Sequence, residues 1–315
     1  MFIVTGGAGF IGSNLVKTLN DKGFKNIWIV DHTDSPEKEQ NLNALTFDKL
    51  IHKQDFLIQL PQLNPQDIDI IFHQGACSDT LETNETYMMA NNYEYSKTLL
   101  DYCAENNIRL IYASSASVYG NGDQGFVENP TCENPLNLYA KSKHLFDQYV
   151  RTKLSHFPTQ LLGLRYFNVF GPQEVHKGRM ASVIYHFHNQ IEQSGKLHPF
   201  EGSDTFIRDF IYIEDIMNVL MFFYEHPNLN GIFNCGTGKG ESFMTLANTM
   251  SSLYKDATIE IKPFPDSLKG QYQTYTQADL SSLRDIGYNT PFTSLKEGIK
   301  AYVNILQNQN GYLAA

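Results

Sequence analysis

The 315-residue sequence contains only four cysteines, Cys77, Cys103, Cys132 and Cys235. They are far apart and form no Cys-x-x-Cys pair. This spacing argues against a disulfide framework and against a cysteine metal site, and it fits a reducing compartment.

Basic runs and long apolar segments are also missing. Net charge is −10, and no Lys/Arg stripe occurs, so nucleic acid is not an expected partner. No stretch reaches transmembrane length, and the start of the chain shows no basic n-region or cleavage site, so we expect no membrane association and a cytoplasmic location. Hydrophobic residues make up 42% and charged residues 18%, as in ordinary globular proteins, and the length allows two lobes.

The first informative pattern is an apolar run that breaks into glycines at Gly6, Gly9 and Gly12. This spacing predicts a strand, a tight turn and a helix start, whose free N–H groups suit a pyrophosphate. A second apolar run, Ile27–Val30, ends in Asp31, nineteen residues after Gly12. An acid at that place accepts hydrogen bonds from an adenosine ribose.

The choice between NAD and NADP stays open from these residues. Asp31 favours a free ribose 2′-hydroxyl and therefore NAD. The nearby His32, Lys38 and Lys53 would offset the charge of a 2′-phosphate and favour NADP.

Alternating apolar and helix-length segments predict an α/β fold with a Rossmann-type, doubly wound parallel sheet. The predicted strands are Phe2–Thr5, Ile27–Val30, Ile68–His73, Arg109–Ala113 and Thr159–Tyr166. The predicted helices are Tyr87–Asn106 and Leu138–Leu154.

Glycine and proline become denser after Gly171-Pro172. We therefore assign residues 1–170 to a cofactor-binding domain and residues 171–315 mainly to a smaller C-terminal substrate-binding α/β lobe. Phe210–Ile213 and Ile232–Cys235 are apolar enough to rejoin the main sheet. Residues 32–48 are polar and predict a surface loop.

Hydroxyl and amine side chains follow the fourth predicted strand. The run Tyr112–Gly120 switches to small hydroxyl residues, which we expect to face the cleft at the carboxyl end of the sheet. Tyr139 and Lys143 lie one helical turn apart. An ammonium beside a tyrosine lowers the pKa of the phenol, and Ser115 can orient a reacting oxygen. Asn91, on the preceding predicted helix, can support this site.

These motifs, in this order, resemble the extended short-chain dehydrogenase/reductase superfamily. The resemblance rests on the glycine motif, Ser115, Tyr139 and Lys143, together with Tyr166–Pro172 and Arg208–Asp215. It implies a Rossmann domain, a nicotinamide cofactor and a nucleotide-sugar substrate.

A narrower resemblance covers nearly the whole chain. The segments that carry it are His73–Ser78, Tyr87–Tyr93, His176–Val183, Phe200–Ser203, Phe264–Pro265 and Gly270–Leu280. They are similar to the branch that epimerises ADP-heptoses at C6″ for lipopolysaccharide core synthesis. Members often carry Glu at the place of Gln74 and a small residue at that of Arg179. The resemblance implies NADP as the cofactor and inversion by transient oxidation of the alcohol to a ketone.

The resemblance also implies roles for individual residues. Tyr139 and Lys177 would be the two acid–base groups, supported by Lys143 and Ser115. The expected cofactor-binding residues are Gly6, Gly9, Phe10, Ile11, Gly12, Asp31, His32, Lys38, Lys53, Gln74, Gly75, Ala76, Cys77, Ser78, Asn91, Lys143, Val169 and Lys177. The expected substrate-binding residues are Ser115, Asn168, Arg179, His186, Phe200, Glu201, Gly202, Ser203, Arg208 and Tyr272.

No metal site is expected, because His186 and His188 lie two residues apart and do not share a helix face. A homo-oligomer is expected.

Two alternative functions stay open. One is a UDP-sugar 4-epimerase or a dTDP-sugar 4,6-dehydratase on the same fold, although the residues after Ser115 lack the acidic pair that elimination needs. The other is a non-catalytic NADP-binding protein, which would have no use for Ser115, Tyr139 and Lys143.

Overall fold

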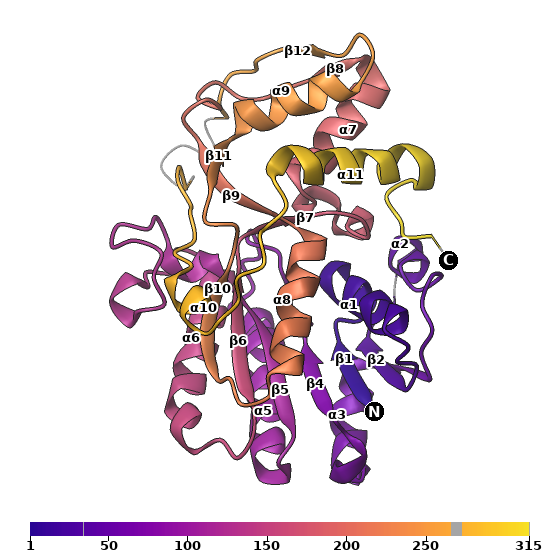
Figure 1. The fold of residues 1–315 in the computed structure, drawn as a ribbon, viewed down its shortest axis with the longest axis vertical. Coiled ribbons are helices and arrows are strands. Elements are labelled where there is room, and N and C mark those ends of the chain that lie inside the picture. Colours follow the sequence, from indigo (N-terminus) through magenta and orange to yellow (C-terminus); the bar gives the residue numbers. More distant parts are fainter. Residues whose placement is uncertain (34, 266–272, 315) are drawn as a thin grey trace.

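A computed structural model describes residues 1–33, 35–265 and 273–314, and its centre is a seven-stranded parallel sheet (Figure 1). The strand order is β10-β6-β5-β4-β1-β2-β3. Their bounds are β1 Phe2–Thr5, β2 Ile27–Asp31, β3 Lys49–His52, β4 Ile70–His73, β5 Arg109–Ser115, β6 Leu161–Tyr166 and β10 Gly231–Cys235. The order reverses between β1 and β4, where open α/β sheets bind ligands. The predicted Rossmann-type sheet is confirmed.

Helices cover both faces of this sheet. One face carries α1 (Phe10–Asp21) and α8 (Ile213–Glu225); the other carries α3 (Lys53–Gln59), α5 (Tyr95–Asn106) and α6 (Leu138–Lys153). Successive residues of β1 serve the two faces in turn, because Val4 packs in one apolar cluster with Leu15 of α1, while Ile3 packs in another with Leu99 of α5. Strands buried on both sides are therefore apolar throughout.

The remaining elements build a second part on top of the sheet (Figure 1). It contains the small sheets β11-β9-β7 and β12-β8. Its elements are β7 Asn168–Phe170, α7 Val183–Ser194, β8 Lys196–Leu197, β9 Ile207–Tyr212, β11 Gly240–Ser242, α9 Phe243–Leu253, β12 Thr258–Ile259 and α11 Leu295–Gln309. Three short helices complete the described α-helices: α2 Pro36–Gln40, α4 Glu85–Met88 and α10 Ser281–Asp285.

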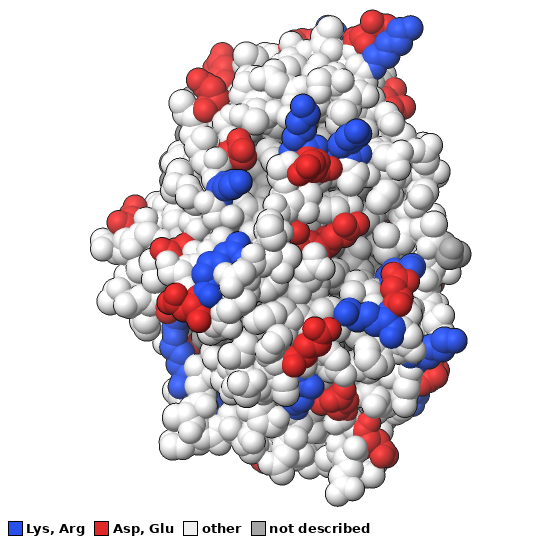
Figure 2. Space-filling view, viewed as in Figure 1, with Lys and Arg blue, Asp and Glu red and all other residues white. Residues whose placement is uncertain are grey.

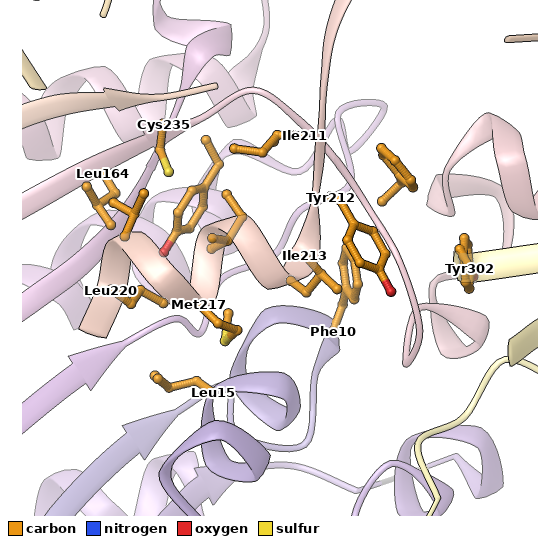
Figure 3. Packing of buried hydrophobic residues seen from close by; sticks show 14 of the residues in the cluster. Phe10, Leu15, Leu164, Ile211, Tyr212, Ile213, Met217, Leu220, Cys235 and Tyr302 are labelled. Carbon is orange, nitrogen blue, oxygen red and sulfur yellow. The ribbon is translucent and has the colours of Figure 1, made fainter. Parts of the chain in front are cut away.

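One apolar cluster joins the two parts. Phe10 and Met217, which pack on the main sheet, belong to the same cluster as Ile211, Tyr212 and Tyr302 (Figure 3). The small sheet is therefore held against the Rossmann sheet by a shared core.

The two segments expected to rejoin the main sheet have different outcomes. Ile232–Cys235 does so as part of β10, which pairs with β6. The expectation for Phe210–Ile213 is wrong, because β9 pairs in parallel with β7 and antiparallel with β11. An apolar segment indicates burial but does not name the neighbouring strand.

Two local predictions also need correction. The polar segment 32–48 is not all loop, since α2 forms there behind the N-cap Ser35, whose hydroxyl accepts from the Lys38 amide. The expected single helix Tyr87–Asn106 is interrupted by a π-helical segment, Met89–Glu94. Such an extra residue per turn is common at functional sites and redirects the side chains it carries.

Acidic and basic side chains are interspersed on the face drawn in Figure 2. Within the ranges that the structure describes, no helix is long and apolar enough to cross a bilayer.

Candidate active site

The glycine turn after β1 forms a backbone cradle. Gly6 has φ +69°, and a Cβ there would lie 2.6 Å from the Gly75 Cα. A Cβ on Gly12 would lie 2.1 Å from the Gly6 carbonyl oxygen. Helix α1 starts behind Gly9 without a side-chain cap, so its first N–H groups are available for an anion. The turn fits a pyrophosphate.

A cavity of about 530 Å³ opens at the carboxyl ends of the parallel strands. Every residue expected to bind the cofactor lines it, and so do Ser115 and Tyr139. It also brings together β1, β2, β4 and β5 with α6 and the 3-10 turn Val175–Met180.

Asp31 lies at one end of the cavity with both carboxylate oxygens engaged. Oδ2 accepts from the Ala8 amide at 2.9 Å, and Oδ1 accepts from Lys38 Nζ at 2.6 Å. Lys53 Nζ donates to Asn91 Oδ1 at 2.6 Å, which places Asn91 and the π-helical segment beside the cavity. This end therefore carries two lysines beside a carboxylate that the protein already satisfies.

Tyr139 and Lys143 both face the cavity from the first turns of α6. Asn137 caps this helix, since its Oδ1 accepts from the Ala140 amide at 2.8 Å. Lys143 Nζ donates to the Ala113 carbonyl at 2.8 Å. Burial lowers the pKa of Lys143 to about 8, while Asp147 acts in the opposite direction.

The expectation of a lowered pKa for Tyr139 is wrong for the protein chain alone, because the net shift is upward. Burial raises the pKa of this phenol, and a hydrogen bond with Ser115 opposes the rise only in part. The Lys143 ammonium is engaged by the Ala113 carbonyl. A phenolate here needs further positive charge in the cavity.

The hydroxyl run after β5 does not face the cleft as a whole. Ser115 and Ser114 line the cavity, but the Ser114 hydroxyl donates to the buried Asp147 at 2.9 Å. Ser117 donates through its own hydroxyl to Ser115 Oγ at 2.9 Å.

Lys177 enters the cavity from the 3-10 turn Val175–Met180. Its side chain is half-buried, and Nζ lies 5.1 Å from the centre of the Phe10 ring. Burial lowers the pKa of this amine, while Glu174 acts in the opposite direction. Lys177 is thus a cavity lysine rather than a freely solvated one.

Arg179 and Gln74 have partners that the sequence did not indicate. Arg179 Nη2 pairs with Asp79 Oδ2 at 2.6 Å across the rim of the cavity. Gln74 acts as a hydrogen-bond acceptor, because its Oε1 accepts from the Tyr166 hydroxyl at 2.9 Å.

Most residues expected to bind the substrate do not line this cavity. Ser115 and Arg179 do. The others lie on β7, α7, β9 and the segment before β9: Asn168, His186, Phe200, Glu201, Gly202, Ser203 and Arg208. Tyr272 lies outside the described residues. Arg208 is buried in β9, where its guanidinium donates to the carbonyls of Ile207 and Gln273.

Sequence reasoning missed eleven further cavity residues. They lie on strand ends, on turns and on the helices α4 and α5: Thr5, Val30, Asp79, Tyr87, Tyr95, Ala113, Ser114, Tyr166, Phe167, His176 and Met180. Thr5 and Val30 are the last residues of two predicted strands, and extending the predicted strand Arg109–Ala113 by one residue finds Ser114. His176 belongs to the His-Lys-Gly motif, and burial together with Lys38 and Lys177 lowers the pKa of its imidazole to about 4.

Comparison with known proteins places this geometry in a family. Residues 2–236 match the model of the NAD dependent epimerase/dehydratase family. The chain is 53% identical over 317 residues to the ADP-L-glycero-D-manno-heptose-6-epimerase of Brachyspira hyodysenteriae, covering 99% of this chain and 100% of the relative.

Solved structures of epimerases have the same fold as this chain. The Helicobacter pylori ADP-L-glycero-D-manno-heptose-6-epimerase superposes with a TM-score of 0.85 at 29% identity, covering 98% of this chain and 96% of that one. The UDP-glucose 4-epimerase of Thermotoga maritima, solved with UDP-glucose, superposes with a TM-score of 0.82 at 25% identity, covering 98% and 99%. With its glycine cradle, its tyrosine and lysine on one helix face, and these relatives along its whole length, the chain belongs to the NAD dependent epimerase/dehydratase family.

Proposed function

We propose that this protein is an isomerase that inverts C6″ of ADP-D-glycero-D-manno-heptose to give the L-glycero epimer. The observation that supports the proposal most directly is that one cavity contains Tyr139 on α6 and Lys177 on the turn Val175–Met180. Two proton-transfer groups on separate elements suit an inversion, because the two configurations present their oxygen differently.

The carbon to be inverted explains why a nicotinamide is needed. C6″ bears an alcohol and has no neighbouring carbonyl, so its hydrogen is not acidic. Oxidation to a ketone and reduction from the other face inverts it without net redox. When bound, a nicotinamide dinucleotide accepts and returns the hydride; the chain's own residues bind, orient and move the protons.

Tyr139 is the proposed base on one face. Ser115 orients the substrate oxygen, and the Lys143 ammonium favours the phenolate. Because burial raises the pKa of Tyr139, the phenol becomes a base only beside additional positive charge, which an oxidised nicotinamide carries.

Lys177 is the proposed acid–base group on the other face. Its lowered pKa makes it a better proton donor and acceptor near neutrality than a solvated lysine. It sits two residues before Arg179, whose pair with Asp79 closes the rim beside it.

We propose NADP as the cofactor. The Asp31 carboxylate is already satisfied by Ala8 and Lys38, which leaves it less able to bind a free ribose 2′-hydroxyl. Lys38 and Lys53 add positive charge for a 2′-phosphate. Denaturing the purified protein and identifying the released nucleotide tests this: NADP is expected, and NAD alone would contradict it.

We propose that residues 1–170 mainly bind the cofactor and that residues 171–315 mainly bind the substrate. The homo-oligomer stays a prediction.

The function is tested by incubating the purified protein with ADP-D-glycero-D-manno-heptose and, separately, with UDP-galactose. We expect the heptose to approach an equilibrium mixture of two epimers without a lasting change in nicotinamide absorbance. Conversion of UDP-galactose alone would favour a UDP-sugar 4-epimerase. Conversion of neither would contradict the proposal and favour a binding protein.

A further inference from the structure

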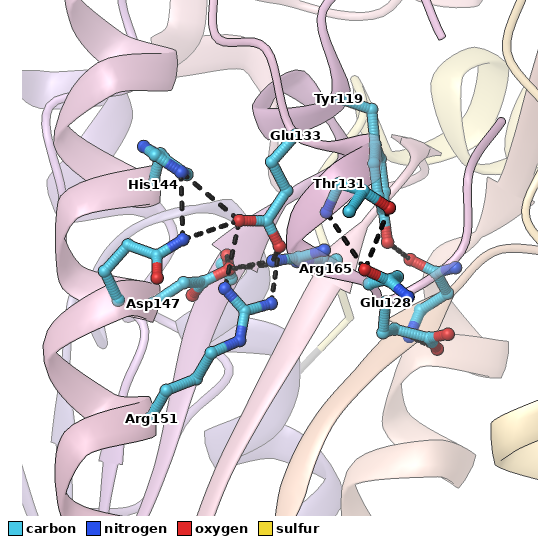
Figure 4. Close-up of polar contacts among 12 residues, drawn as sticks. Tyr119, Glu128, Thr131, Glu133, His144, Asp147, Arg151 and Arg165 are labelled. Carbon is cyan, nitrogen blue, oxygen red and sulfur yellow. Dashed lines mark hydrogen bonds and ion pairs between the residues drawn. The ribbon is translucent and has the colours of Figure 1, made fainter. Parts of the chain in front are cut away.

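An ionic cluster joins Asp147 and Arg151 of α6, Arg165 of β6 and Glu133 (Figure 4). The side chains of Asp147, Glu133 and Arg165 have no exposed surface. Arg165 Nη2 lies 2.8 Å from Asp147 Oδ2 and also pairs with Glu133, whose second oxygen accepts from Arg151 at 3.0 Å. Buried charges of this kind seldom add net stability, so their retention calls for another role.

Asp147 connects this cluster to β5. Its Oδ1 accepts from the Tyr112 hydroxyl and its Oδ2 from the Ser114 hydroxyl, both at 2.9 Å. Between those two residues, the Ala113 carbonyl accepts from Lys143 Nζ. Three successive residues of β5 are therefore tied to one face of α6, and the next residue in the strand is Ser115.

The tie has a geometric consequence. Tyr139, Lys143 and Asp147 follow one another at intervals of one turn on α6. The same bonds that hold Asp147 against β5 thus set the distance between the Tyr139 phenol and the Ser115 hydroxyl. Arg165 holds the carboxylate from β6, where it pairs in register with Ser114.

We infer that Asp147 is a positioning residue for the Tyr139–Lys143 pair: it fastens α6 to β5 beside Ser115 and places a buried negative charge one turn from the Lys143 ammonium. This inference rests on the proposed roles of Tyr139 and Lys143. Asp147 is not among the residues that line the cavity, and it acts through Lys143.

The groups around Lys143 indicate what loss of that charge would do. On β4, burial lowers the pKa of His73 to about 3, and Lys143 acts in the same direction, so this imidazole is neutral in the working range. On α6 itself, Tyr139 is a neutral phenol in the chain alone, and Asp147 supports the ammonium. On β5, the Ala113 carbonyl accepts from it.

Charged groups on the other elements packed against α6 have other partners. Glu85 of α4 pairs with Lys141, and Asp101 of α5 accepts from the Tyr149 hydroxyl and pairs with Lys153. Removing the Asp147 charge should therefore lower the pH at which Lys143 loses its proton.

The test compares Asp147→Asn with the matched variant Glu133→Gln in the enzyme carrying its cofactor. Both remove one buried negative charge from the cluster, but Glu133 bonds neither to β5 nor to Lys143. For Asp147→Asn we expect the alkaline limb of the pH–kcat/KM profile to move about one unit lower and kcat to fall roughly tenfold. For Glu133→Gln we expect a lower unfolding temperature and an unmoved limb. Asp147→Glu should restore part of the wild-type profile.

Identical pH limbs in the two variants would overturn the inference and leave Asp147 a structural residue. If Asp147→Asn does not fold, Ser114→Ala and Tyr112→Phe cut the same tie from the strand side. We expect each to lower kcat several-fold at unchanged KM, and unchanged kcat in both would equally overturn it.

A wild-type protein that epimerises nothing would instead contradict the proposed function. In that case the pH dependence of NADP binding decides the inference, because Lys143 lines the cofactor cavity. The same downward shift is expected for Asp147→Asn and not for Glu133→Gln.

Discussion

The cofactor end and the substrate end of this molecule differ in how their residues come together. Every residue expected at the cofactor lines one cavity, whereas most of those expected at the substrate lie outside it. Most of the cofactor cavity comes from strand ends of the main sheet, the turns directly after them and the start of α6, so many neighbours in space follow short sequence motifs. The substrate residues come from β7, β9 and α7, whose relative placement depends on tertiary packing.

The two ends also differ in how firmly their polar groups are held. At the cofactor end, His73 bridges Thr5 of β1 at 2.6 Å and Ser96 of α5 at 2.7 Å, all buried. At the rim, the Arg179 side chain is 65% exposed and that of Asp79 30%, and exposed ion pairs contribute little to stability. We therefore expect the buried contacts of His73 to be held more firmly than the pair at the rim.

The largest effect is expected for Tyr139→Phe, which removes only the proposed proton acceptor. Turnover should fall by about 10²–10⁴-fold, while the amount of cofactor that purifies with the protein stays the same. Initial rates measure the turnover, and the nucleotide released on denaturation measures the retained cofactor. Near-normal turnover in a folded variant would remove Tyr139 from the mechanism.

Lys177→Met should lower epimerisation by on the order of 10²-fold and also spare cofactor binding. The proton donor on the second face is lost together with the Nζ that lies over the Phe10 ring, while methionine keeps an unbranched aliphatic side chain at this position. A 6″-aldehyde analogue, offered to this variant and to Tyr139→Phe, reports which configuration each still processes.

Identical failure of both variants on both configurations would contradict the two-base assignment. So would full activity of Lys177→Met. Tyr139 would then serve both faces.

A pair of variants separates the two ends directly. Gly12→Ala should abolish cofactor retention, because its Cβ would lie 2.1 Å from the Gly6 oxygen. Arg208→Gln should raise KM for the nucleotide sugar about tenfold, if Arg208 binds its phosphates, and leave retention intact. Loss of cofactor from Arg208→Gln would show that the two ends do not act separately.

The last expected effect concerns acid stability at the cofactor end and leaves activity at neutral pH untouched. Burial lowers the pKa of His73 to about 3, so between pH 6.5 and 3 the unfolded chain takes up a proton that the folded chain refuses. Stability should therefore fall with falling pH in this window, by at most about 1.4 kcal/mol per unit from this residue. Urea unfolding of the wild type and of His73→Gln at pH 7 and 4.5 measures this change in the free energy of unfolding. An equal loss of stability in both proteins would exclude His73 as the cause.

The sequence alone predicted many of the residues that line the cavity and placed Tyr139 and Lys143 on one helix. The glycine spacing, Asp31 after the second strand and the Tyr139–Lys143 interval are local features, and each maps directly onto a turn, a strand end or a helix face. The Rossmann-type sheet follows from the same alternation of apolar runs and helical segments.

Only the tertiary structure decided the rest, because it depends on contacts between residues far apart in the chain. It placed β9 beside β7, paired Arg179 with Asp79, and enclosed Asp147 with Arg165, Tyr112 and Ser114. It also reversed the expected direction for the Tyr139 pKa: helical spacing brings an ammonium near, but burial, which no local pattern reports, has the larger effect.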